Sequence, residues 1–298
     1  MTRRKRIRMA MQKNGRLSEK STSLLGRCGL EFGWSKDRLF SKCENFPLDL
    51  TLVRDDDIPE YVCDGVCELG VVGLNVLKEK LLARGADKPG RARVLRRLGF
   101  GHCRLSLAVP ADRPYRGVRS LKGTRIATSY PATLREFLRK SKVEADIVEI
   151  SGSVEIATTL DIADCVCDLV STGTTLRSNG LKEVETVFES ECVLARTGLP
   201  LSAGQERTAA RLLQRIDGVM RAADAKYIML NAPADALSSL KKVLPGMEEP
   251  TIIPLGGDGK RVAVHAVAYE PVFWETMERL KAAGASSILV VPIEKIIA

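Results

Sequence analysis

Several short stretches near the start of the chain alternate apolar and polar residues, and this period of two predicts strands with one buried face. The clearest is 48–54, "LDLTLVR". Residues 17–29 differ, because their apolar positions fall on one face of a helix that stops at Gly29. Four strands are predicted in this part of the chain: 7–11, 48–54, 68–73 and 103–110.

From residue 122 the pattern becomes one of strands that alternate with helices. Three strands and two helices follow in the order 123–129, 130–140, 145–150, 153–164 and 165–171. Such an order predicts a parallel α/β unit, in which ligands collect at the carboxyl ends of the strands. Strands at 184–190 and 191–196 then lead to an amphipathic helix at 205–225.

The last part of the chain has a rhythm of its own. Strands and helices are predicted in the order strand 226–233, helix 234–244, strands 250–255 and 261–267, helix 271–284 and strand 286–293. This βαββαβ order is that of the ferredoxin-like unit. Residues 226–298 are therefore predicted to form a separate domain.

Composition and charge limit which classes of molecule the protein is expected to bind. The 298 residues carry a net charge of +9, which favours an anionic partner, although the basic runs at 3–8 and 91–97 are also compatible with solvated faces. Aromatic residues make up only 5%, which argues against stacking on nucleic-acid bases. Eight cysteines without a CxxC spacing and only two histidines predict no zinc site and a reducing compartment. Neither a secretory signal nor a membrane-spanning run is predicted, so we expect a cytoplasmic protein with no nucleic-acid or membrane partner.

The stretch 168–180, "DLVSTGTTLRSNG", is the main candidate for a binding site. Small and hydroxylated residues follow a buried strand there and precede a helix, so main-chain N–H groups and hydroxyls are available for a phosphate. Gly173 lets the backbone approach such a ligand without a Cβ. Asp168 is suited to ribose hydroxyls or to water bound to Mg²⁺. The alternative is an ordinary loop in which a Ser or Thr caps the helix, and no Walker sequence is present.

This stretch resembles the phosphoribosyl-pyrophosphate loop of the ATP phosphoribosyltransferase family, the first enzyme of histidine biosynthesis. Further segments resemble the family in its order: "RIRMAMQKNGRLS", "RDDDIPEYVCDGVCELGVVGLNVL", "GFGHCRLSLAVP", "SGSVEIA" and "FWETMERLKAAGASSILVVPIEK". The resemblance covers nearly the whole chain and includes the C-terminal domain of the long form. Two positions depart from the pattern, since Thr174 stands where Ala is common and Arg177 where an acidic residue is common.

The resemblance implies the fold class: α/β, with a bilobal periplasmic-binding-protein-like catalytic part and a C-terminal ferredoxin-like βαββαβ regulatory domain. The implied domains are lobe I at 1–105, completed by about 190–225, lobe II at 106–189, and the regulatory domain at 226–298. The implied enzyme is a pentosyltransferase that joins N1 of ATP to C1 of phosphoribosyl pyrophosphate and releases pyrophosphate. It also implies Mg²⁺ as cofactor, L-histidine as inhibitor, and dimers that assemble into hexamers.

The resemblance, together with the chemistry, also nominates site residues. Lys13, Arg16 and Asp168 are the catalytic candidates. The substrate-binding candidates are Gly15, Arg54, Asp57, Glu155, Ser171, Thr172, Gly173, Thr174 and Thr175. The candidates for the histidine site are Asn231, Thr251, Ala285, Ser286 and Ser287. The sequence does not identify metal ligands, although the acidic run 55–57 is suited either to Mg²⁺ or to a helix N-terminus.

Two other classes of function fit parts of the sequence. The bilobal binding-protein fold also serves non-enzymatic sensors of small ligands. A protein that binds nucleic acid through its charge alone is the second alternative, and it would bind any duplex with a steep dependence on salt.

Overall fold

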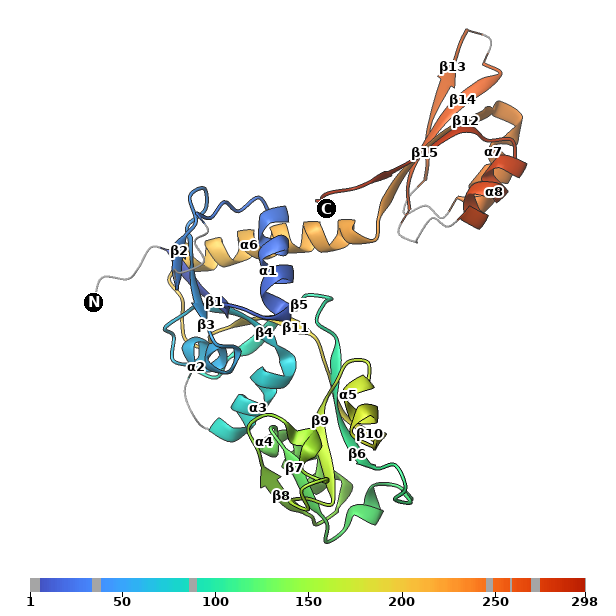
Figure 1. The fold of residues 1–298 in the computed structure, drawn as a ribbon. Coiled ribbons are helices and arrows are strands. Elements are labelled where there is room, and N and C mark those ends of the chain that lie inside the picture. The colour runs from blue at the N-terminus through green and yellow to red at the C-terminus, as the bar shows by residue number, and fades with distance from the viewer. Residues whose placement is uncertain are drawn as a thin grey trace. The chain divides into compact units, whose positions relative to one another are not determined.

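The computed structural model describes residues 6–33, 39–85, 90–244, 249–257, 259–268 and 274–297. The chain divides into two compact units, residues 1–209 and 210–298 (Figure 1). Each unit is built around its own sheets, and each is described separately below.

Lobe I of the first unit is a six-stranded sheet in the order β2-β3-β1-β4-β11-β5. The three strands β1, β3 and β4 are parallel, whereas β2, β11 and β5 run antiparallel to their neighbours. Its strands are β1 (Ile7–Gln12), β2 (Phe40–Lys42), β3 (Leu48–Val53), β4 (Leu69–Gly73), β5 (Arg93–Arg97) and β11 (Cys192–Arg196). Its helices are α1 (Arg16–Arg27), η1 (Asp55–Asp57), α2 (Ile58–Cys63) and α3 (Leu74–Arg84).

Lobe II is a five-stranded sheet in the order β10-β6-β9-β7-β8, in which β7 is parallel to both β8 and β9. Its strands are β6 (Cys103–Pro110), β7 (Arg125–Thr128), β8 (Asp146–Glu149), β9 (Cys165–Val170) and β10 (Leu181–Ser190). Its helices are η2 (Val118–Leu121), α4 (Pro131–Ser141), η3 (Val154–Ile156) and α5 (Thr174–Ser178). The chain enters this lobe between β5 and β6 and returns between β10 and β11. The predicted bilobal α/β architecture is thereby confirmed.

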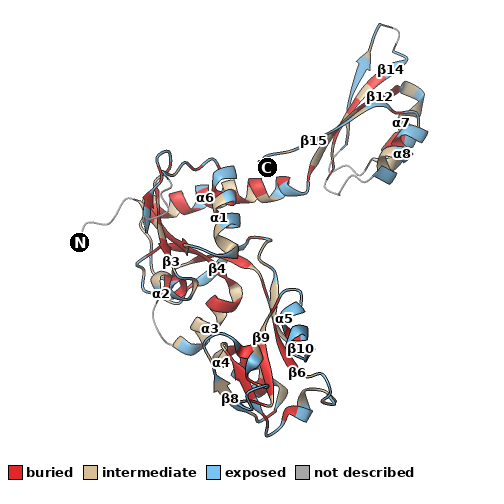
Figure 2. Cartoon of the chain, in the orientation of Figure 1, coloured by how far each residue is buried: buried red, intermediate tan, exposed pale blue. Residues whose placement is uncertain are grey.

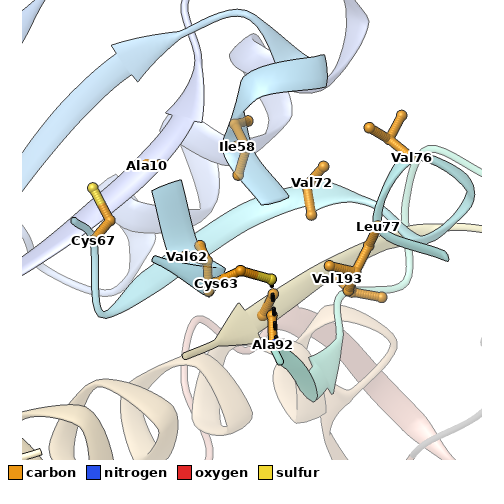
Figure 3. Packing of buried hydrophobic residues seen from close by; sticks show 11 residues of the cluster. Ala10, Ile58, Val62, Cys63, Cys67, Val72, Val76, Leu77, Ala92 and Val193 are labelled. Atoms are coloured by element: carbon orange, nitrogen blue, oxygen red, sulfur yellow. Dashed lines mark hydrogen bonds between the residues drawn. The ribbon is translucent and has the colours of Figure 1, made fainter. Parts of the chain in front are cut away.

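Apolar side chains from sequence-distant elements form the core of each lobe. In lobe I, Ile58 and Val62 of α2 pack with Val72 of β4 and Val193 of β11, as Figure 3 shows. The thiol of Cys63 in this core accepts a hydrogen bond from the main-chain N–H of Ala92 at 3.4 Å. Lobe II has apolar clusters on both sides of its sheet. These cores hold the carboxyl ends of the strands in fixed positions.

One predicted helix in lobe II is wrong. The segment 153–164 forms only the 3-10 turn η3 followed by turns, and Asp161 adopts a positive φ of 56° that ends any helical path. Leu160 and Ile162 are both exposed. Glu155 therefore lies in a single turn and does not open a helix.

The second unit contains the predicted ferredoxin-like sheet, with strand order β13-β14-β12-β15 and antiparallel neighbours throughout. The unit runs from within α6 (Ala203–Ala223) through β12 (Lys226–Pro233), η4 (Ala234–Ala236), α7 (Leu237–Val243), β13 (Thr251–Leu255), β14 (Arg261–Ala268), α8 (Trp274–Ala282) and β15 (Ser286–Pro292). Alternate residues of β12 and β14 are buried beneath α7 and α8 on one face of the sheet (Figure 2). No helix in the described ranges has the length and apolar character needed to cross a membrane.

Candidate functional site

Lobe I has a pocket at the carboxyl ends of β1 and β3, with a volume of about 410 Å³. It brings together three of the predicted residues, Lys13, Arg54 and Asp57. The main-chain N–H of Lys13 donates to the carbonyl of Val53 at 3.0 Å, which ties the two strand ends to each other. Two cationic side chains beside an acidic turn therefore line one recess.

Gly15 ends the turn that follows β1 and directly precedes α1. Its φ is 116°, a conformation that side chains rarely adopt, and a Cβ there would lie 2.8 Å from Nε2 of Gln12. Glycine is thus required for the tight approach of the turn to the start of α1. Arg16 is the first residue of this helix. The structure describes the main chain of Arg16 but not its side chain.

The loop 171–175 leaves β9 at the carboxyl end of the sheet of lobe II, as predicted. Gly173 adopts a φ of 75° and precedes the five-residue helix α5. Ser171, Thr172, Thr174 and Thr175 are exposed. Within the described part of the chain, none of the five main-chain N–H groups of this loop donates a recorded hydrogen bond. The loop therefore presents free donors to solvent.

Arg177 brings a positive charge to this loop. Its Nη2 donates to Oγ1 of Thr174 at 3.4 Å, and its Nη1 lies 3.0 Å from the position that a Cβ on Gly173 would occupy. This guanidinium adds positive potential next to the loop.

Asp168 and Glu155 lie close enough to interact at the same end of lobe II. Burial raises the pKa of the Asp168 carboxyl, the hydrogen bond from the main-chain N–H of Leu169 (2.7 Å) lowers it, and the charge of Glu155 raises it again. Asp168 thus lies two residues before the end of β9, and the carboxylate of Glu155 lies near it. This arrangement is suited to sugar hydroxyls or to a cation.

Tyr130 is a candidate that the sequence did not reveal, because residues 130–140 were assigned only to a helix. It follows β7 and precedes Pro131, the first residue of α4. Burial raises the pKa of its hydroxyl, and the charges of Asp56, Asp168 and Asp55 raise it further. Since Asp55 and Asp56 belong to lobe I and Asp168 to lobe II, Tyr130 lies where the two halves of the candidate site meet.

The carboxylates of this region meet the modest requirements of Mg²⁺, which is usually held by one or two carboxylates together with substrate phosphates. Asp55, Asp56 and Asp168 all act electrostatically on Tyr130. In the described ranges, no three His, Cys, Asp or Glu side chains are grouped closely enough to hold a metal ion.

The residues predicted for the histidine site all lie in the second unit. Some of them share the open face of its sheet, and others do not. Asn231 pairs with Ser286 across β12 and β15 and, by strand alternation, faces away from the helices. Thr251 shares this open face, because it pairs with His265, whose ring accepts or donates a hydrogen bond of 2.9 Å with Tyr227. Ala285, in contrast, is buried in the core on the helix side, and Ser287 adopts a positive φ of 49°.

A family model of ATP phosphoribosyltransferase matches residues 54–218, and a model of the C-terminal domain of the same family matches residues 222–295. The chain belongs to the ATP phosphoribosyltransferase family. The two matches in sequence confirm the resemblance to the long form. ATP phosphoribosyltransferases are pentosyltransferases of histidine biosynthesis, and the chain is an enzyme of this kind.

Two solved structures are similar to this chain, and the first shows the same fold. A chain of the ATP phosphoribosyl transferase (HisG:HisZ) complex from Thermotoga maritima is 23% identical with a TM-score of 0.58, and the match covers 71% of this chain and 98% of that chain. The alkanesulfonate-binding protein SsuA from Xanthomonas axonopodis pv. citri is 15% identical with a TM-score of 0.45, with 98% of this chain and 88% of that chain covered.

Proposed function

We propose that this ATP phosphoribosyltransferase transfers the 5-phosphoribosyl group of phosphoribosyl pyrophosphate to N1 of ATP. The bond from N1 to C1 of the ribose forms while the bond from C1 to the pyrophosphate oxygen breaks. The electron pair of the broken bond leaves with pyrophosphate, and positive charge develops on the sugar. Catalysis of such a step depends on position and on charge, so it requires no strong protein nucleophile.

The observation that supports this proposal most strongly is the loop 171–175. Its free main-chain N–H groups, its hydroxyls and the adjacent Arg177 are suited to the 5-phosphate of the sugar. Asp168, at the end of the same strand, orients the ribose hydroxyls. Glu155 supports the nucleotide from the neighbouring turn.

In this proposal, lobe I binds the pyrophosphate that leaves and the triphosphate that remains on ATP. Lys13 and Arg54 share the pocket beyond β1 and β3 with Asp57. Arg16 and Gly15 contribute from the first turn of α1, where main-chain N–H groups also favour anions. The two lobes thus supply opposite ends of one reaction site.

Mg²⁺ neutralises charge on the pyrophosphate when it is bound. Asp55 and Asp56, or else Asp168, are the side chains we assign to it or to its water molecules, since no three carboxylates are grouped together in the described ranges. They are hard oxygen ligands, and the first two follow Arg54 beyond β3, the strand that lines the lobe I pocket. The protein residues still perform the binding and orientation of both substrates.

We further propose that residues 226–298 form a regulatory domain that binds L-histidine. Asn231, Thr251 and Ser286 offer polar side chains on the open face of its sheet. Ser287 and the buried Ala285 contribute main-chain groups only. If histidine favours a less active arrangement, the coupling is reciprocal, and substrates weaken the binding of histidine.

The lobes at 1–105 (completed by about 190–225) and 106–189 form the catalytic part in this proposal. We also propose a cytoplasmic enzyme that assembles from dimers into hexamers. Light scattering of the purified protein, with and without histidine, tests the assembly. A single monomeric species under both conditions contradicts it.

The activity is tested by absorbance of the modified adenine with Mg²⁺, ATP and phosphoribosyl pyrophosphate. We expect product formation that L-histidine inhibits. Turnover that L-histidine does not inhibit contradicts the regulatory role but not the catalytic activity. Absence of turnover with any divalent metal, at low and high salt, favours the alternative of a non-enzymatic sensor.

A further inference from the structure

A short chain of hydrogen bonds connects the two lobes and ends at the hydroxyl of Tyr130. The main-chain N–H of Asn75, on α3, donates to Oγ of Ser190 at 2.9 Å, and the hydroxyl of Ser190 donates to Oδ1 of Asn75 at 2.9 Å. Nδ2 of Asn75 then donates to the hydroxyl oxygen of Tyr130 at 2.9 Å. Asn75 and Ser190 are 6% and 4% exposed, so the two bonds between them are shielded from water.

The orientation of the Asn75 amide sets the direction of this chain. Its Nδ2 faces Tyr130, so the oxygen of Tyr130 accepts from Asn75. Its Oδ1 faces Ser190 and accepts from the hydroxyl of that residue. The phenolic proton of Tyr130 is left free to donate on the side away from Asn75. In the described ranges of the chain, the Tyr130 hydroxyl donates to no protein acceptor.

The surroundings of Tyr130 place this free donor at the candidate site. The carboxylates of Asp55 and Asp56 from lobe I, and of Asp168 from lobe II, act on its hydroxyl. Strand β7, which leads to Tyr130, is parallel to β9, which carries Asp168. Both residues therefore lie at the carboxyl edge of the same sheet, where the substrate is proposed to bind.

The joint between the lobes keeps Tyr130 in place. Helices α3 and α4 lie side by side (Figure 1). Glu79, one turn after Asn75 on α3, accepts from the main-chain N–H groups of Ala132 at 2.7 Å and Thr133 at 2.8 Å. The start of α4 is thus capped by a carboxylate of the other lobe, one residue beyond Pro131.

We propose that Asn75, oriented by Ser190, is a positioning residue that holds the Tyr130 hydroxyl as a hydrogen-bond donor for an acceptor atom of the bound substrate. The inference rests on the proposed function, since it requires a substrate in the cleft. It adds a role for two residues, Asn75 and Ser190, that do not touch the substrate themselves.

A double-mutant cycle tests the proposal. Tyr130→Phe removes the donor and keeps the ring, and we expect it to raise the KM for one of the two substrates about tenfold with little change in kcat. Asn75→Leu has a similar volume and removes the amide, so we expect a rise of about three- to tenfold in the same KM. If Asn75 acts through Tyr130, adding Asn75→Leu to Tyr130→Phe causes no further rise.

Lys78→Met is the matched control, because Lys78 lies on the same side of α3 but contacts Glu136 at 3.0 Å and the ring of Phe188 at 4.2 Å instead. We expect wild-type KM values for it. If Asn75→Leu does not fold, Asn75→Ala replaces it in the cycle. Circular dichroism of each variant establishes that the comparison is made between folded proteins.

The outcomes separate this inference from the proposed function. No product with the wild-type protein would overturn both. Product with the wild-type protein, together with a wild-type KM for the Asn75 variant, overturns the positioning role alone. The positioning role is also overturned if Asn75→Leu raises the KM by the same factor in the wild type and in Tyr130→Phe. The two residues would then act independently.

Discussion

Replacement of Gly173 by alanine tests the phosphate loop at its most constrained point. The φ of Gly173 is 75°, and alanine in this left-handed conformation costs about 1–2 kcal/mol. The added Cβ would lie 3.0 Å from Nη1 of Arg177, the end of a flexible side chain that can move, and 3.7 Å from Cγ1 of Val170. We therefore expect the free energy of unfolding to fall by about 1–2 kcal/mol without loss of the fold.

The effect on substrate binding should be larger than this strain suggests. A methyl group at the tip keeps the phosphate from approaching the main-chain N–H groups. Loss of one hydrogen bond to a charged group costs about 1.5–3 kcal/mol, which corresponds to an affinity for phosphoribosyl pyrophosphate weaker by about 10- to 150-fold. Titration calorimetry with phosphoribosyl pyrophosphate and Mg²⁺ measures this change.

Gly123→Ala is a matched control. Gly123 has a φ of 72°, nothing lies within 4 Å of its added Cβ, and it precedes β7 at the opposite end of the strands. In urea unfolding, Gly123→Ala should lose about as much stability as Gly173→Ala. It should keep the wild-type affinity for phosphoribosyl pyrophosphate. Wild-type affinity in the Gly173 variant, or equal loss of affinity in both variants, refutes the assignment of the phosphate to this loop.

Three further predictions concern charge and the joint between the lobes. Arg177→Gln should weaken binding of phosphoribosyl pyrophosphate several-fold and reduce its dependence on salt, as followed by calorimetry at two ionic strengths; an unchanged salt dependence contradicts a contribution of this charge. Glu79→Gln should lower the midpoint of urea unfolding, since loss of a helix cap costs about 1 kcal/mol, and an unchanged midpoint contradicts the cap across the lobes. The guanidinium of Arg104, which donates hydrogen bonds to Glu183, lowers the pKa of that carboxyl. The stability that the carboxylate contributes is therefore present above its unfolded pKa and is lost as the pH falls through the folded value. Glu183→Gln should accordingly be less stable than the wild type at neutral pH and approach it at acid pH, and a constant difference at all pH values contradicts this.

Local patterns in the sequence predict most of the fold because they record which side of each element is buried. The alternation at 48–54 and the βαββαβ order after residue 226 both correspond to strands and helices of the structure. The segment 153–164 misled this reasoning, because several of its apolar residues fit a helical spacing although Leu160 and Ile162 are exposed in the structure. Periodicity reports a possible buried face and does not reveal whether a partner surface exists.

The loop 171–175 was accessible to prediction because its chemistry is contained in consecutive residues. Tyr130 was not, since its hydroxyl depends on Asn75, which is 55 positions away, and Asn75 depends on Ser190, which is 115 positions away. Each of these residues reads as an ordinary polar residue at a helix or strand end. Only the packing of the two lobes brings them together.

The most direct test of the account is a crystal structure of the enzyme with phosphoribosyl pyrophosphate and Mg²⁺. The account predicts the 5-phosphate oxygens at about 2.7–3.1 Å from main-chain nitrogens of residues 171–175, with the ribose hydroxyls at Asp168. A 5-phosphate bound elsewhere, with these N–H groups facing solvent or turned inward, would contradict it.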